Sequence, residues 1–267
     1  MQFRSFAIKL PVDWEDPSQP EAARQYADAF QPSERAAVPI PVPPALFLAS
    51  SANKYHCDTA KEISNKLEGF IDGICEAICS AWSQWQSMAT LTGVIINAVT
   101  AAGGQAVGPP WGPFILAGAP KSTPQELKYS TAVANAIDAG WTAYQSSIKV
   151  PGLPWYPAFA AFPGPVAPPM PNVPVPVIAL TQVAAPVSKA QLKSTMIGCL
   201  GDPKAAHHAE LFDCIADAFE KCFTIWQAST MVTNVLGTGP IPTFAPPFVP
   251  VGPVVAGVGN MIPGGFV

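Results

Sequence analysis

The sequence predicts a mainly α fold with extensive Pro/Gly-rich extended segments, built from three internal helix-plus-proline-arm repeats around a pseudo-three-fold axis. Three observations lead to this prediction. A helical motif occurs three times, proline-rich stretches follow its copies, and charged residues are missing from the later part of each copy. Internal similarity of this kind is typical of duplicated structural units. At 267 residues the chain is long enough for one large domain or two small ones.

The repeated motif reads aliphatic, small, polar, Ala and bulky apolar, then an aromatic residue, then an aromatic–Gln pair. Its copies span 74–86, 133–145 and 215–227. Trp82, Trp141 and Phe223 share one register, and the pairs that follow are Trp85-Gln86, Tyr144-Gln145 and Trp226-Gln227. We expect three equivalent helices whose aromatic residues fill a core, with the glutamines bonding unpaired backbone of the arms. A ligand pocket made of three aromatic residues is the alternative interpretation.

Helix boundaries follow from capping residues and from glycine. The first helix is expected from Thr59 to about Ala101, where Gly103-Gly104 ends it. The second should begin after Thr123 or Ser122 and end near Ile148. A short helix should run from Ser188 to about Cys199, and the third long helix from Pro203 to about Leu236, before Gly237.

The proline-rich arms are unusual because their other residues are apolar. Residues 150–187 and 238–267 are expected to be ordered, without regular secondary structure, and packed on helices or on adjacent subunits. A Pro-aromatic-x-Pro pattern recurs in the chain and contains Trp111, Trp155 and Phe248. The predicted organisation is an N-terminal extended arm with a short helix (1–52) and three repeat units, at 53–121, 122–187 and 188–267.

Composition limits the function classes. Only 12% of the residues are charged, which predicts a surface covered by a partner, by copies of the chain or by lipid. The net charge is −4 and the basic residues are scattered, so we expect no nucleic-acid partner. The N-terminus lacks the apolar core of a signal peptide, which predicts synthesis in the cytoplasm with free thiols.

No catalytic, cofactor or metal motif stands out. The three histidines do not combine with a nucleophile motif, and the glycine-rich stretches lack the Lys-Ser/Thr of a phosphate loop. The cysteine spacings do not match structural zinc sites, and the least mismatched ligand set is His207, His208 and Cys214. We therefore expect no cofactor and no enzyme activity.

A membrane role is the main alternative. Residues 88–107 contain no charge and approach the length that crosses a bilayer, but they hold several polar residues and lack flanking Lys/Arg clusters. The other uncharged stretches are broken by proline. Membrane contact is therefore not favoured, an enzyme on an unfamiliar helical scaffold is the third hypothesis, and an unspecified binding module is the remaining possibility.

The stretches Gly108-Pro-Pro-Trp-Gly-Pro-Phe and Pro246-Pro-Phe-Val-Pro-Val-Gly-Pro resemble in style the small structural proteins of phage tails and contractile injection particles. The resemblance covers style and repeat organisation, and no functional residue is transferred from it. It implies a structural subunit of a virion, phage tail or injection particle, with the particle's other structural proteins or its own copies as partners. The residues expected to form packing and interface contacts are Trp82, Trp85, Trp111, Trp141, Tyr144, Trp155, Phe223, Trp226 and Phe248.

Overall fold

The computed structural model describes the backbone of residues 50–202, 205, 208–242 and 251–267, and within these ranges the side chains from Glu62 onward. The chain divides into two compact units, residues 1–72 and 73–267. Of the first unit, the described part is the beginning of helix α4 (Ser50–Met88). The predicted N-terminal arm and its short helix lie outside the described residues, except for 50–52, which belong to α4. This helix begins at Ser50 and not at Thr59.

The second unit is a mixture of helices and antiparallel sheet, so the predicted mainly α fold of three repeats is wrong. Besides the end of α4, its helices are α5 (Trp111–Gly118), α6 (Pro124–Ser147), α7 (Lys189–Leu200) and α8 (His208–Ser229). The main sheet has the strand order β3-β2-β1-β10-β8-β5 and is antiparallel throughout. Its strands are β1 (Thr90–Asn97), β2 (Thr100–Val107), β3 (Val150–Leu153), β5 (Val166–Met170), β8 (Val235–Pro240) and β10 (Gly257–Met261).

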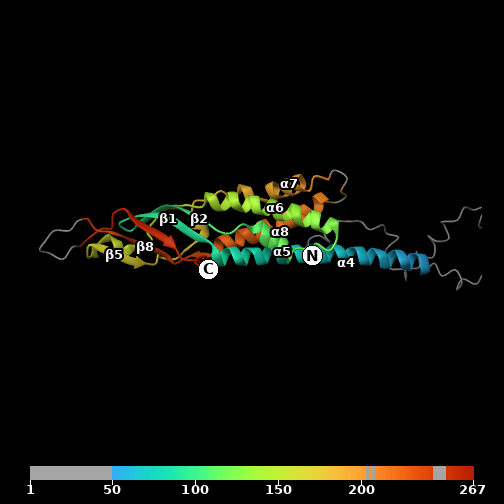
Figure 1. Ribbon diagram of the computed structural model, residues 1–267, viewed down its shortest axis with the longest axis horizontal. Helices are drawn as coiled ribbons and strands as arrows, with labels where there is room; N and C mark the ends of the chain where they lie inside the picture. Colours follow the sequence, from blue (N-terminus) through green and yellow to red (C-terminus); the bar gives the residue numbers. More distant parts are fainter. Residues whose placement is uncertain (1–49, 203–204, 206–207, 243–250) are drawn as a thin grey trace, which may run out of the picture. The chain divides into compact units, whose positions relative to one another are not determined.

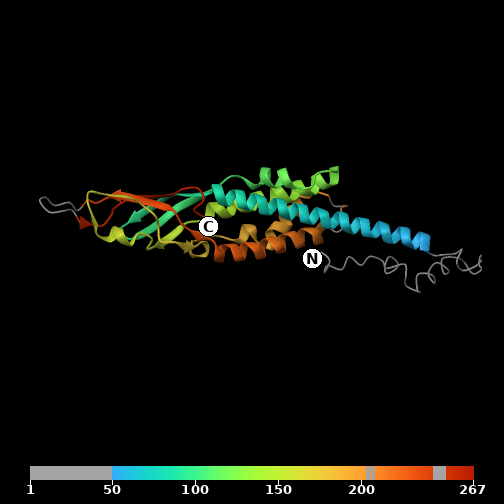
Figure 2. The same ribbon diagram turned by 90° about the horizontal axis from the view of Figure 1, so that it is seen from below.

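Short elements complete the described part of this unit. Two small antiparallel sheets join β4 (Phe162–Pro163) to β9 (Val251–Gly252) and β6 (Val175–Pro176) to β7 (Met231–Val232). Three 3-10 turns are η2 (Pro157–Ala160), η3 (Val177–Ala179) and η4 (Ala185–Val187). Within the second unit the helices gather at one end and the six-stranded sheet lies at the other (Figures 1 and 2).

The start of α6 confirms a prediction made from its capping residues. The Glu126 backbone N–H donates to Thr123 Oγ1 at 3.1 Å, and the Thr123 N–H donates to Glu126 Oε2 at 3.0 Å. This reciprocal pair satisfies two N–H groups that a helix end otherwise leaves free. At α7 the cap comes from elsewhere, because the Lys189 N–H donates to Glu220 Oε1 at 3.0 Å while the Ser188 hydroxyl donates to Ala185 O.

The first long helix ends at Met88, and the segment after it forms the β1–β2 hairpin instead of continuing as helix. Val94 and Ile96 are buried while Ile95 and Asn97 are exposed, the period-two pattern of a half-buried strand. β-Branched residues such as Val94, Ile95 and Ile96 favour this conformation. The paired glycines expected to end the helix, Gly103-Gly104, lie inside β2.

The third long helix is also shorter than predicted. It ends at Ser229, and the residues expected to finish it enter strand β8. Gly237 lies within this strand and not at a helix end. A Cβ at Gly237 would come within 2.6 Å of the Tyr156 ring, so the close approach of that ring to the strand requires glycine here.

The proline-rich arms contain regular strands, contrary to prediction. Residues 150–187 supply β3 and β5, the two edge strands of the main sheet. Pro168 and Pro169 lie in β5 where its register with β8 shifts, and Pro151 lies in β3 beside a similar irregularity. Proline lacks the N–H that a central strand must donate, but edge strands and bulges tolerate it.

The described parts of the arms are ordered and packed, as predicted. Trp155, Tyr156 and Phe159 are buried, and Tyr156 stacks on Phe159 with ring centroids 5.0 Å apart. The Tyr156 hydroxyl donates to Val235 O at 2.8 Å. The segment after β3 therefore packs against the sheet, with the Tyr156 ring against Gly237 of β8.

One sheet draws strands from all three predicted repeat units. β1 and β2 come from 53–121, β3 and β5 from 122–187, and β8 and β10 from 188–267. The central pairing joins β1 to β10, with Ile95 opposite Val258. The three segments thus contribute to a shared sheet instead of forming separate helical repeats.

Candidate functional site

The aromatic residues of the three motif copies meet in one cluster. The three stretches are helical, as predicted, and lie in α4, α6 and α8. Trp141 is central: its ring centroid lies 5.3 Å from Trp82, 4.3 Å from Trp111 and 6.2 Å from Phe223. The rings contact one another directly, which favours a packed core over a ligand pocket between them.

The aromatic–Gln pairs join the three helices through side-chain hydrogen bonds. Trp85 Nε1 in α4 donates to Gln145 Oε1 in α6 at 2.9 Å. Gln227 Nε2 in α8 donates to the Tyr144 hydroxyl in α6 at 3.3 Å. Trp226 Nε1 in α8 donates to Gln86 Oε1 in α4 at 3.2 Å. Each helix is therefore bonded to the other two.

The residues expected to form packing or interface contacts are mostly buried. Phe248 lies outside the described residues, and Trp82 is partly exposed. Trp155 is buried in the proline-rich segment after β3 and not among the helices. The remaining buried members are Trp85, Trp111, Trp141, Tyr144, Phe223 and Trp226. These residues therefore pack inside the protein, and the apolar residues that remain exposed on its surface are different ones.

The sheet differs from the helices in having no charged side chain. Charged residues are absent from 77–120, 150–188 and 222–267, and these stretches contain every described strand. Ile95 is 55% exposed and its cross-strand partner Val258 is 46% exposed, on the central strands β1 and β10. Val166 on edge strand β5 is 57% exposed. Sequence reasoning noted the uncharged stretches but missed these exposed residues, because it did not identify the strands.

The charges gather on the helices instead. Asp213 of α8 pairs with Lys189 and Lys193 of α7, each at 2.9 Å. Hydrogen bonds from Lys193 and Lys189 hold the pKa of Asp213 below its usual range. Asp217 pairs with Lys221 at 2.6 Å and with Lys189 at 3.3 Å. The charged surface of α7 and α8 is thus largely neutralised by its own ion pairs.

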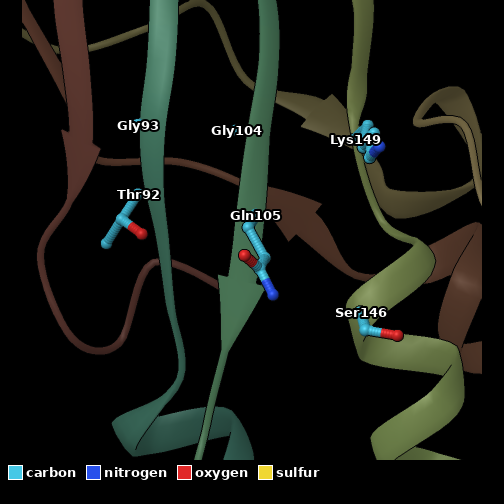
Figure 3. Close-up of a pocket in the computed structure, with 6 residues that line it drawn as sticks. All are labelled: Thr92, Gly93, Gly104, Gln105, Ser146 and Lys149. Carbon is cyan, nitrogen blue, oxygen red and sulfur yellow. The ribbon is translucent and has the colours of Figure 1, made fainter.

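A polar pocket of about 510 Å³ lies where the sheet meets the end of α6. Figure 3 shows its lining from three neighbouring elements, with Thr92 on β1, Gln105 on β2, and Ser146 and Lys149 at the end of α6 and just beyond it. The register passes from Thr92↔Gln105 to Val94↔Gly103, so Gly93 and Gly104 lie opposite each other between these pairs. Both glycines have positive φ, 70° and 78°, a backbone conformation that glycine adopts more readily than residues with a Cβ.

Lys149 is the charged residue of this pocket. Its backbone pairs with Thr181 in both directions at 2.9 Å, and no ion pair holds its ammonium group among the described residues. With the hydroxyl of Thr92 and the amide of Gln105, the pocket offers hydrogen-bond donors and one positive charge, whereas the Ser146 hydroxyl already donates to Ala143 O at 2.8 Å. It is therefore suited to hold a carboxylate or another small anion.

No arrangement for metal binding is found within 50–202, 205, 208–242 and 251–267, where no three His, Cys, Asp or Glu side chains converge. Of the least mismatched set of metal ligands, His207 lies outside the described residues, His208 Nδ1 lies 2.6 Å from Ala205 O, and Cys214 is buried.

Burial raises the pKa of Tyr144 to about 12, so this phenol stays neutral in the folded protein at ordinary pH.

The described helices also bear on the membrane alternative. None of them combines the length and the apolar character that a transmembrane span requires. The uncharged window 88–107, considered above as a span, is the β1–β2 hairpin.

Comparisons with known proteins give no relative from which a function could be transferred. The chain matches no protein-family model, no curated protein and no solved structure.

Proposed function

We propose that this protein is a structural subunit of a large protein assembly of the virion, phage-tail or phage-tail-like injection-particle class. The observation that carries the proposal is the uncharged sheet with exposed aliphatic residues on its central strands. A surface that remains in water usually carries charged side chains, whereas a permanent interface is depleted of them. The exposed pair Ile95 and Val258 therefore marks the surface that would meet a neighbouring subunit.

The edges of the sheet favour contact through the face and not through added strands. β3 and β5 are the edge strands, and both contain proline. Proline and register shifts at an edge prevent another chain from extending the hydrogen-bond ladder. A partner that packs on the face gains by burying aliphatic side chains, and each one contributes roughly 1.5–3 kcal/mol when fully covered.

The experiment follows assembly in the cells that naturally make the protein. The tagged wild-type chain is sedimented through a density gradient together with an Ile95→Lys variant. We expect the wild type in fractions far heavier than its 28.0 kDa monomer and the variant in light fractions. A lysine at the centre of an apolar contact should weaken association roughly 30-fold or more, equivalent to about 2 kcal/mol.

The matched control is Ile225→Lys, because Ile225 is 68% exposed on α8, on the helical part of the molecule. It should sediment like the wild type. A wild-type chain found in light fractions would contradict the proposal. Flotation of the wild type with lipid vesicles, combined with loss of the heavy fractions in detergent, would support the membrane alternative instead.

A further inference from the structure

Two exposed thiols occur on helices that contact each other. Cys79 of α4 and Cys222 of α8 are both free and exposed. The two helices meet through aromatic rings, since the Trp82 centroid lies 5.2 Å from Phe219 and 5.7 Å from Trp226. These contacts belong to the second compact unit.

The spacing along each helix places the two thiols on this contact. Cys79 lies three residues before Trp82, and Cys222 lies three residues after Phe219 and four before Trp226. Residues three or four apart are neighbours on one helical face. Because Phe219 and Trp226 both touch Trp82, the residue between them on that face also lies against α4.

Electrostatics agree with this placement. The pKa of Cys79 is raised, first by burial and then by the charges of Cys222 and Glu76. A thiolate at residue 222 acts on Cys79 in this way only from nearby. Helices packed about 8–10 Å apart, with Cα atoms about 2.3 Å from each axis, bring directly facing Cα atoms to about 3.4–5.4 Å, a range that overlaps the roughly 4.4–6.8 Å that a disulfide spans.

The geometry points to Cys79 and Cys222 as a redox-active thiol pair that a peroxide converts into a disulfide between α4 and α8. The thiolate of one cysteine attacks hydrogen peroxide, breaks its O–O bond and becomes a sulfenic acid. The second thiol then displaces the hydroxyl group of the sulfenic acid as water and forms the S–S bond. In sum, two thiols and one peroxide give one disulfide and two waters. This assignment does not depend on the proposed assembly role.

The bond would tie together the two helices that lead into the sheet. α4 runs into β1, and α8 precedes β7 and β8. A cross-link between such distant positions removes conformational freedom mainly from the unfolded chain. We expect the oxidised protein to melt about 5–10 °C above the reduced protein.

The test treats the reduced full-length protein with hydrogen peroxide and maps the products by non-reducing peptide mass spectrometry. We expect a linked peptide that joins Cys79 to Cys222 within one chain, and its loss in Cys79→Ser and Cys222→Ser. The matched control is Cys199→Ser on α7, which removes another exposed thiol and should leave the linked peptide unchanged. Circular dichroism of each serine variant checks that the fold is intact.

A second measurement uses dibromobimane, which becomes fluorescent when it bridges two adjacent thiols. It should label the wild type and the Cys199→Ser variant, but neither of the other two variants. The inference is overturned if the linked peptide is absent, if Cys79 pairs with a different cysteine, or if oxidation yields only sulfinic acid or links between chains.

Discussion

The Trp226 indole N–H donates to the Gln86 side-chain oxygen across 3.2 Å, although 140 residues separate the two in sequence. The amide nitrogen of Gln86 donates in turn to the Phe266 carbonyl at 2.9 Å. One glutamine therefore joins α4, α8 and the C-terminal segment, with both ends of its amide in use. This arrangement makes the position sensitive to the loss of polarity.

Replacing Gln86 by leucine should lower the free energy of unfolding by about 1–3 kcal/mol, because two partly buried groups lose their partner. Urea denaturation monitored by tryptophan fluorescence would measure the change. The control is Gln84→Leu on the same helix. The Gln84 amide donates only to Ser80, an exposed residue one turn earlier in α4, so its loss breaks no bond between helices. Equal stabilities for the two variants would contradict a bridging role for Gln86.

Trp141→Ala should destabilise the protein by about 3–5 kcal/mol, the usual cost of truncating a large aromatic side chain in a core. Trp141 is 1% exposed and contacts the rings of Trp82, Trp85 and Trp111. Thermal unfolding followed by circular dichroism would measure the loss, with the exposed neighbour Thr142→Ala as control. An unchanged melting curve would mean that this cluster does not form the core.

Gly237→Ala should cost about 1–3 kcal/mol through overpacking. The added methyl group would lie 2.6 Å from the Tyr156 ring, and that ring is held by its hydroxyl bond to Val235 O. Gly198→Ala in α7 is the matched control, since a Cβ there meets nothing within 4 Å and alanine favours helix. Calorimetry should therefore show a lower melting temperature for Gly237→Ala and a higher one for Gly198→Ala. Melting temperatures that shift in the same direction in both variants would argue against close packing at Gly237.

Alkaline pH should destabilise the fold through Tyr144. Burial raises the pKa of this phenol to about 12, whereas in the unfolded chain it ionises near its ordinary value of about 10. Below pH 10 both states hold the proton, so this contribution is complete. Between pH 10 and 12 the unfolded state loses protons first, and stability falls by up to about 1.4 kcal/mol per pH unit.

Tyr144→Phe should reduce this slope, because the variant has no phenol to ionise. Urea denaturation at pH 9, 10 and 11 would compare the two proteins. The residual slope of the variant has another source in Tyr156, whose pKa burial also raises. Identical slopes for wild type and variant would show that Tyr144 does not contribute.

Local chemistry made the helical part of the molecule predictable. The pair of reciprocal hydrogen bonds between Thr123 and Glu126, a capping box, spans four residues, so its spacing in the sequence is enough to identify it. The shared register of Trp82, Trp141 and Phe223 reports one buried helical face, and these residues do meet around Trp141. Their partners across the helices, such as Gln145 for Trp85, depend on tertiary packing and could not be read from spacing alone.

The sheet was not predicted, because its strands depend on distant pairing. Residues 90–107 are uncharged and rich in alanine and glycine, which hides their two-residue alternation beside a long helix. The prolines of 150–187 argued against strands, a rule that holds for central positions and not for the edges that β3 and β5 occupy. The uncharged surface was visible in the sequence, whereas the exposed pair Ile95 and Val258 required the register of β1 with β10.

The pairing of β1 with β10 also sets an order of events during synthesis. The Gly93 N–H on β1 bonds the Asn260 side chain 167 residues later in the chain, and at about 5–20 residues per second a ribosome needs roughly ten seconds or more to cover that stretch. For most of this interval the hairpin of β1 and β2 is complete but has no β10 to pair with. An uncharged, aliphatic hairpin in a nascent chain is a binding site for chaperones. The yield of folded protein in a cell therefore depends on how well chaperones shield this hairpin until β10 is made.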